Sequence, residues 1–130
     1  MRVAILLALV AAAGCSKKPT EGGVRLEQVS ESFNSAGLKA DNFTPTDPTR
    51  FNATKCVAGR VEDIDTVVCE YGSMDALALG KKAGEQWASG ANTAAVLGNG
   101  RTVLAVADRE RVDPNGKTIH KITRAFTQVR

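Results

Sequence analysis

The pattern of hydrophobic and polar positions predicts an apolar N-terminal run followed by alternating helices and hairpins. Residues 3–13 carry only apolar side chains. After a polar stretch, apolar residues recur at helical spacing over residues 24–36, and Gly37 follows where a helix C-cap belongs. Residues 38–43 fit a short strand. The two prolines within residues 44–48 indicate a surface loop that ends any regular element.

Residues 55–71 are typical of a β-hairpin, because apolar positions alternate on both sides of an acidic loop at residues 62–65. In the expected pairing, even-numbered residues of the first strand face odd-numbered residues of the second. Cys56 then shares a face with Cys69. Paired or diagonal neighbours across two strands can be close enough for a disulfide.

A second helix is predicted from the N-cap Ser73 to the terminating residues 89–90. Each glycine inside a helix costs up to about 1 kcal/mol relative to alanine. We therefore expect Gly80 and Gly84 to allow a close approach of this helix to a sheet. Its predicted apolar face consists of Ala76, Leu79, Gly80, Ala83, Gly84 and Trp87.

A second hairpin and a last helix complete the pattern. The Asn-Gly pair at residues 99–100 predicts a type I′ turn between two strands. The returning strand, residues 102–107, hardly alternates, so we expect it to lie centrally in the sheet. Asp113 and Pro114 are expected to cap and open the last helix. Its apolar stripe consists of Ile119, Ile122, Ala125, Phe126 and Val129.

This order of elements predicts the α+β class. We expect a two-layer sandwich, in which helices pack on an antiparallel sheet of four to five strands.

The apolar run at residues 3–13 has the character of a signal peptide. It follows the basic Arg2, and as a helix it would be roughly 16 Å long, about half the thickness of the hydrocarbon core. Two alternative cleavage sites fit the end of this run. Residues 11–13, Ala-Ala-Ala, fit ordinary secretory cleavage. Residues 12–15, Ala-Ala-Gly-Cys, resemble the lipobox of bacterial lipoproteins, a family that favours leucine at the first of these positions.

The cysteine count favours the lipobox. The chain has three cysteines, and an odd number in an exported protein requires an explanation. The resemblance implies that Cys15 is lipidated, which leaves Cys56 and Cys69 as a pair. In an oxidising compartment we expect this pair to form a structural disulfide.

The lipoprotein resemblance divides the chain into three segments. These are a signal peptide at residues 1–14, a lipidated cysteine with a flexible tether at 15–23, and a single α+β domain at 24–130. The resemblance implies a cell-envelope protein held on a membrane surface by lipid at Cys15. In a cell with two membranes, Ser16 resembles the family's signal for passage to the outer membrane, where the domain would face the periplasm.

The charge balance gives no basis for binding nucleic acid. The chain has 17 lysines and arginines against 14 acidic residues, a weakly basic balance that does not form a nucleic-acid footprint. The last helix nevertheless presents a possible basic contact face for anionic headgroups or an acidic partner. Complementing the helix dipole is the alternative role of these cations, which are Lys117, Lys121 and Arg124.

Recognised catalytic patterns are absent from the sequence. Residues 116–118, Gly-Lys-Thr, resemble the end of a phosphate-binding loop, but Arg111 stands where its first glycine is required. His120 is the only histidine and falls on the polar face of the last helix. We therefore expect no catalytic residue, no metal site and no cofactor.

The sequence favours a small non-catalytic domain that binds or regulates an unidentified envelope protein at the membrane surface. Two alternatives remain open. One is a small-molecule or lipid carrier, with Trp87 and Phe126 lining a cavity between helices and sheet. The other is an enzyme with an unrecognised site, built from His120 and one of three aspartates, Asp63, Asp65 or Asp108.

Overall fold

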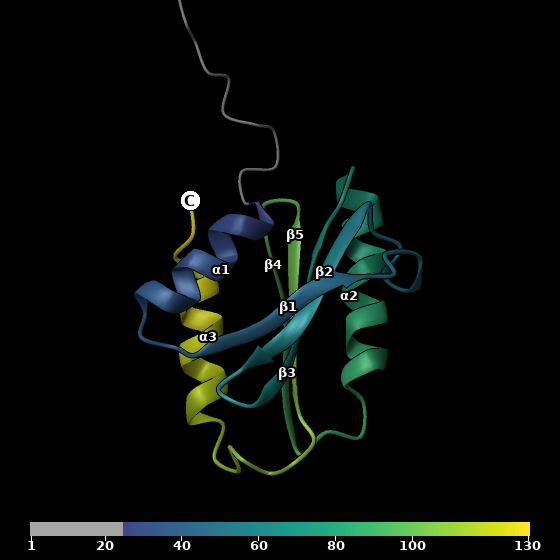
Figure 1. Cartoon of the computed structure of the whole chain (residues 1–130). Coiled ribbons are helices and arrows are strands. Elements are labelled where there is room, and N and C mark those ends of the chain that lie inside the picture. The colour runs from purple at the N-terminus through teal and green to yellow at the C-terminus, as the bar shows by residue number, and fades with distance from the viewer. Residues whose placement is uncertain (1–24) are drawn as a thin grey trace, which may run out of the picture.

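The computed structural model describes residues 25–130, which form a five-stranded antiparallel sheet with helices packed on it (Figure 1). The strand order is β1-β2-β3-β5-β4. The elements are α1 (Leu26–Ser35), β1 (Ala40–Thr46), the 3₁₀ helix η1 (Thr49–Phe51), β2 (Lys55–Val61), β3 (Ile64–Glu70), α2 (Met74–Ala88), β4 (Thr93–Asn99), β5 (Thr102–Asp108) and α3 (Lys117–Thr127). The predicted signal peptide, Cys15 and the tether lie outside the described residues.

The α+β class and the antiparallel sheet are confirmed, and the helices cover both faces of the sheet. Figure 1 shows α1 and α3 on one side and α2 on the other. Alternate residues of the inner strands explain this division: Val68 and Leu104 pack with α1 and α3, whereas Val67 and Val103 pack with α2 and η1. Because β3 and β5 are apolar on both faces, each face requires its own helical layer. The sheet therefore lies between two layers of helices, so the domain has three layers where the sequence pattern predicted two.

The β2–β3 hairpin has the predicted register. Cys56 lies directly opposite Cys69, with Cα atoms 4.1 Å apart, and the two sulfur atoms form a disulfide. The acidic loop is shorter than expected, because only Glu62 and Asp63 lie between the strands. Both have positive φ, 51° and 64°, as the centre of a type I′ turn requires. Residues 64–65, predicted in the loop, begin β3 instead.

The second hairpin turns one residue later than the sequence pattern predicts. Asn99 still pairs with Thr102, so the central residues are Gly100 and Arg101. Only Gly100 of these has positive φ. A glycine at the first central position is typical of a type II′ turn, and the predicted type I′ turn is wrong. β5 is an inner strand, as expected, and all seven of its residues are buried.

The predicted loop at residues 44–48 is wrong in part, because β1 continues through Pro45 to Thr46. A strand tolerates proline where its backbone nitrogen need not donate to a neighbour, and β1 is an edge strand.

The start of the last helix also differs from the prediction. α3 begins at Lys117, so Pro114 lies outside it. Asp113 still caps the helix, although it is not the residue directly before it. Its carboxylate accepts backbone N–H bonds from Thr118 and Ile119, at 3.1 and 2.8 Å. A side chain from the preceding loop thus satisfies two of the free donors at the helix N-terminus.

The two glycines of α2 permit close contact with the sheet, as expected. A Cβ added at Gly80 would lie 2.1 Å from the Tyr71 hydroxyl, and one at Gly84 would lie 3.1 Å from a Val96 methyl carbon. The predicted apolar face is rotated from the real one, because Leu79 is 54% exposed. The residues of α2 that are actually buried are Leu77, Gly80, Gly84 and Ala88.

Tyr71 gives this interface a measurable pH dependence. Its hydroxyl donates to the carbonyl oxygen of Phe51 at 2.9 Å, and burial raises the pKa of Tyr71 to about 12. An unfolded tyrosine has a pKa of about 10. Above that pH the unfolded state loses its phenolic proton first, so the free energy of unfolding should fall as pH rises towards 12. Below pH of about 10 both states are protonated and the phenol contributes no pH dependence.

Because Tyr71 is the only tyrosine in the chain, the ultraviolet absorbance of phenolate reports its ionisation alone. We expect a midpoint near 12 in the folded protein and about 10 in denaturant. A folded-state midpoint equal to that in denaturant would show that the phenol is not buried.

Candidate functional site

The structure separates His120 from the aspartates that the enzyme alternative would combine with it. Asp65 lies on the sheet face covered by α2, whereas His120 is exposed on α3, beyond the opposite face. Asp108 is 1% exposed and accepts backbone N–H bonds from Val112 and Asp113, at 3.1 and 2.8 Å. Asp63 is exposed in the β2–β3 turn. Within residues 25–130, no hydrogen bond or ion pair joins His120 to any of these aspartates.

The carrier cavity suggested by Trp87 and Phe126 is wrong. Trp87 packs with Phe51 on the α2 face, at 6.4 Å between ring centroids. Phe126 is 0% exposed and belongs to the core beneath α1 and α3. The sheet separates the two rings, so they cannot line one cavity.

The three cations of the predicted basic face are all exposed on α3, opposite its buried stripe. They are Lys117, Lys121 and Arg124. Their role in binding stays a prediction.

A cleft of about 330 Å³ lies on the α2 face, between η1 and the C-terminal half of α2. It exists because η1 is short and α2 packs mainly over β4 and β5, which leaves part of β2 and β3 uncovered. Ala58 and Val67 belong to the strands at its base. We call it the Trp87 cleft; its larger lining side chains are Asp47, Arg50, Phe51, Asp65, Trp87 and Arg109.

Arg109 organises one wall of the Trp87 cleft. Its guanidinium carbon lies 4.5 Å from the centre of the Trp87 ring, a cation–π arrangement. Nη1 donates to Asp65 at 2.8 Å, and Nη2 donates to the backbone carbonyl of Trp87. Arg60 also contacts Asp65, at 3.3 Å. These contacts restrain the Trp87 indole ring and the Asp65 carboxylate.

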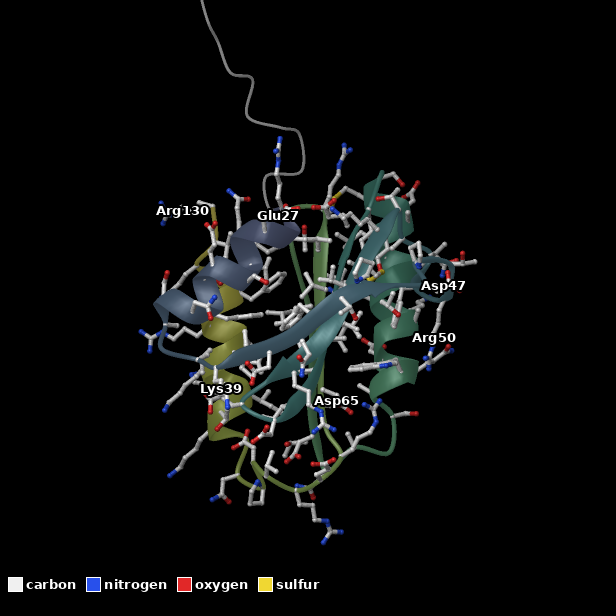
Figure 2. The ribbon with its side chains drawn as sticks, in the orientation of Figure 1. Glu27, Lys39, Asp47, Arg50, Asp65 and Arg130 are labelled. Carbon is white, nitrogen blue, oxygen red and sulfur yellow. A yellow bond between two sulfur atoms is a disulfide. The ribbon has the colours of Figure 1, made fainter. Side chains whose placement is uncertain are left out.

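The opposite wall comes from η1 and the residues before it. Asp47 accepts the backbone N–H of Thr49 at 2.9 Å, and the Arg50 guanidinium lies 5.7 Å from the Phe51 ring centre. Figure 2 shows Asp47, Arg50 and Asp65 on the same side of the molecule. The cleft thus combines aromatic rings with charged groups of both signs, and tryptophan and arginine are enriched among the residues that dominate binding energy at interfaces.

From the sequence, Trp87 and Asp65 were expected in separate roles, and Arg109 was not expected at any site. Asp65 pairs with Ala107, two residues before Arg109, across strands β3 and β5. This pairing joins the two hairpins, and no local pattern in the sequence reveals it.

No protein-family model, curated protein or solved structure matches the chain. Over residues 25–130, histidine, cysteine and acidic side chains form no group that could hold a metal ion. In the same range, no helix has both the length and the apolar character needed to span a bilayer.

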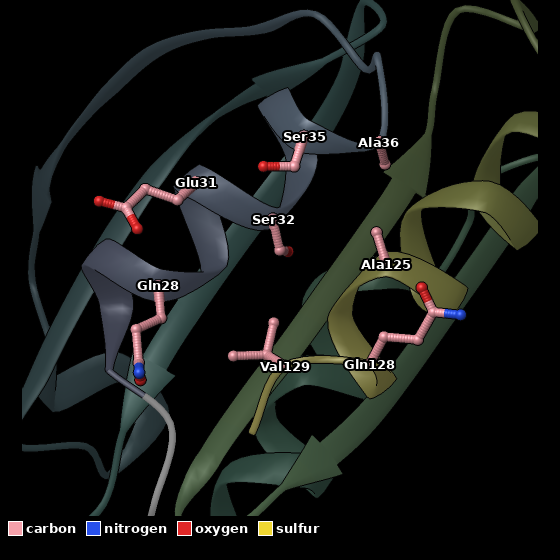
Figure 3. A pocket seen from close by; sticks show the side chains of 8 residues that line it. All are labelled: Gln28, Glu31, Ser32, Ser35, Ala36, Ala125, Gln128 and Val129. Carbon is pink, nitrogen blue, oxygen red and sulfur yellow. The ribbon is translucent and has the colours of Figure 1, made fainter.

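A second hollow, of about 450 Å³, lies between α1 and α3 on the other side of the sheet (Figure 3). It presents hydroxyls, amides and one carboxylate around small apolar side chains, and its lining residues include neither a cation nor an aromatic ring. They are Gln28, Glu31, Ser32, Ser35, Ala36, Ala125, Gln128 and Val129. Aromatic and cationic side chains therefore distinguish the Trp87 cleft from this second hollow.

Proposed function

We propose that this chain is a lipid-anchored cell-envelope protein whose domain binds a partner at the membrane surface without catalysing a reaction. One observation carries the proposal. Of the three cysteines in the chain, Cys56 and Cys69 are bonded to each other. Cys15, in its lipobox-like context, is then the one cysteine left for lipid attachment.

The position of the disulfide supports an exported protein. The bond links neighbouring strands within the core, where Cys56 and Cys69 are 1% and 2% exposed. Structural disulfides persist in the periplasm and outside the cell, and they are rare in the cytosol. We place the anchored domain on the cell-envelope membrane, facing the periplasm from the outer membrane in a cell that has two membranes.

We assign partner binding to the Trp87 cleft. The indole ring is half-buried and held by Arg109, so little conformational freedom remains for a partner to remove on binding. Charged groups of both signs surround it, which suits a protein segment better than a uniformly charged polymer. The proposed partner is another envelope protein.

The anchor is tested by Cys15→Ser. This variant should appear in the soluble fraction of the envelope, or as an uncleaved precursor, because serine offers no thiol for lipid attachment. Thr20→Ala, a change in the tether, is the matched control and should stay membrane-bound. Normal processing of Cys15→Ser together with full membrane retention would contradict the proposed anchor.

Envelope fractions that contain the anchored protein also provide a test of the Trp87 cleft. Trp87→Ala should reduce the capture of an envelope partner after chemical cross-linking, because the ring is the central anchor. Leu79→Ala removes an exposed side chain elsewhere on α2 and should leave capture unchanged. Equal capture by the two variants would remove the cleft from the proposal.

A further inference from the structure

The two edges of the sheet differ in their protection against pairing with another strand. β1 contains an irregularity between Asp41 and Thr44, a positive φ at Asn42, and Pro45. Bulges, prolines and charged residues are the devices by which natural sheets block edge-to-edge association. β1 is therefore a poor surface for another strand.

β4, at the other edge, has none of these devices. Its residues 93–99, Thr-Ala-Ala-Val-Leu-Gly-Asn, contain neither charge nor proline and pair with β5 without interruption. Among residues 25–130, β4 pairs with β5 alone. An edge strand of this kind presents a row of outward backbone N–H and C=O groups that can template pairing with another chain.

Side chains at both ends of β4 hold this edge in place. Thr93 donates its hydroxyl to the carbonyl of Asp113 at 3.2 Å. Asn99 donates its amide to the carbonyls of Phe126 and Val129, at 2.9 and 2.8 Å. Both ends of the strand are thus held by α3 and the segments that flank it, and pairing with another strand requires little further ordering of its backbone.

We propose that β4 pairs antiparallel with β4 of a second copy, so that the two sheets become one continuous sheet. Centred on Val96, this pairing places Ala94 opposite Gly98 and Ala95 opposite Leu97 of the other copy. Each of these contacts between the strands joins uncharged residues, so no like charges lie opposite each other within the strand pair. It is independent of the proposed lipid anchor and partner.

The flank of α2 beside this edge favours a second copy over an unrelated strand. Glu85 lines a hollow of about 220 Å³ together with β4 residues 94–96. Lys81 lies one helical turn earlier on the same flank. A Cβ added at Gly84 would contact Val96, so this part of α2 lies over the proposed symmetry centre. Because a two-fold axis relates the two copies, their α2 helices run antiparallel. Lys81 of each copy then lies near Glu85 of the other.

The association is tested by sedimentation equilibrium over a concentration series, with a Cys15→Ser chain produced without residues 1–14 and their apolar run. The average mass should rise from that of one chain to twice that value. Ala94→Lys places a charge on the exposed edge and should keep the mass at that of one chain. Thr44→Lys makes the matched change at an exposed position of β1 and should not prevent the doubling. A single-chain mass at every concentration, or a doubling unaffected by Ala94→Lys, would overturn the proposal.

A cross-link tests the register separately. Val96 faces itself across the proposed axis, so Val96→Cys in the Cys15→Ser chain should give a covalent dimer on mild oxidation. Thr44→Cys should remain a single chain under the same conditions. Equal cross-linking of both variants, or of neither, would contradict pairing through β4. Circular dichroism of each variant confirms that it is folded.

Discussion

Replacing Cys56 and Cys69 together with alanine should lower the free energy of unfolding by about 2–4 kcal/mol while leaving the fold recognisable. The bond closes a loop between residues 13 positions apart and thereby restricts the unfolded chain. The two sulfur atoms also pack in the core with Phe51, Val67 and Tyr71, so their removal costs some apolar contact. Two helical layers and the rest of the sheet remain to support the native structure.

Denaturant unfolding measures this loss, and the reduced wild-type protein separates its causes. Reduction breaks the cross-link but keeps both sulfur atoms, so it should reproduce most of the effect of the double substitution. Val67→Ala, two residues before Cys69 on β3, is the packing control, because it removes methyl groups without touching the bond. An unchanged free energy of unfolding in the double variant, or free thiols in protein isolated from the envelope, would contradict the structural disulfide.

The second large effect is expected at Gly80→Ala. In an exposed helix this change would stabilise the protein by about 1 kcal/mol. Here the new methyl group would overlap the Tyr71 ring, with its Cβ 2.1 Å from the hydroxyl oxygen and 2.2 Å from Cζ. Overpacking of this kind typically costs about 1–3 kcal/mol. We therefore expect the variant to be less stable than wild type, although alanine has a higher helix propensity than glycine.

A double-mutant cycle with Tyr71→Ala isolates the cause. Removing the ring opens the space, so Gly80→Ala should become neutral or stabilising in that background. Gly84→Ala serves as a comparison with a smaller expected loss of stability, because the nearest atom to its new Cβ would be a Val96 methyl carbon at 3.1 Å. An equal cost of Gly80→Ala with and without the Tyr71 ring would show that helix and sheet do not meet as described.

The sequence predicts this fold best where the signal is local. The disulfide was predictable because one hairpin contains both Cys56 and Cys69, and its alternation sets their register. The N-cap Ser73 was predictable for the same reason, since its side chain accepts the backbone N–H of Ala76 within one turn. Patterns of this range depend only on residues near each other in the chain.

Features that depend on long-range packing were not predictable from the same patterns. Helical spacing indicates that α2 has an apolar face. Which side is buried depends on Tyr71, which follows β3, and on Val96 of β4, and the two lie far from one another in the sequence. Whether each helix covers one face of the sheet or the other depends on the connections between elements. For this reason Trp87 and Phe126 were wrongly placed in one cavity. The Trp87 cleft was missed because it requires the pairing of β3 with β5.

The lipid anchor is the central claim, and mass spectrometry of the N-terminal peptide tests it most directly. Protein purified from its own envelope in detergent should yield a peptide that begins at Cys15 and carries covalently attached acyl chains. A mature N-terminus at Cys15 would also account for the third cysteine beside the bonded pair. An N-terminal peptide that begins elsewhere, or that contains an unmodified Cys15 thiol, would contradict it.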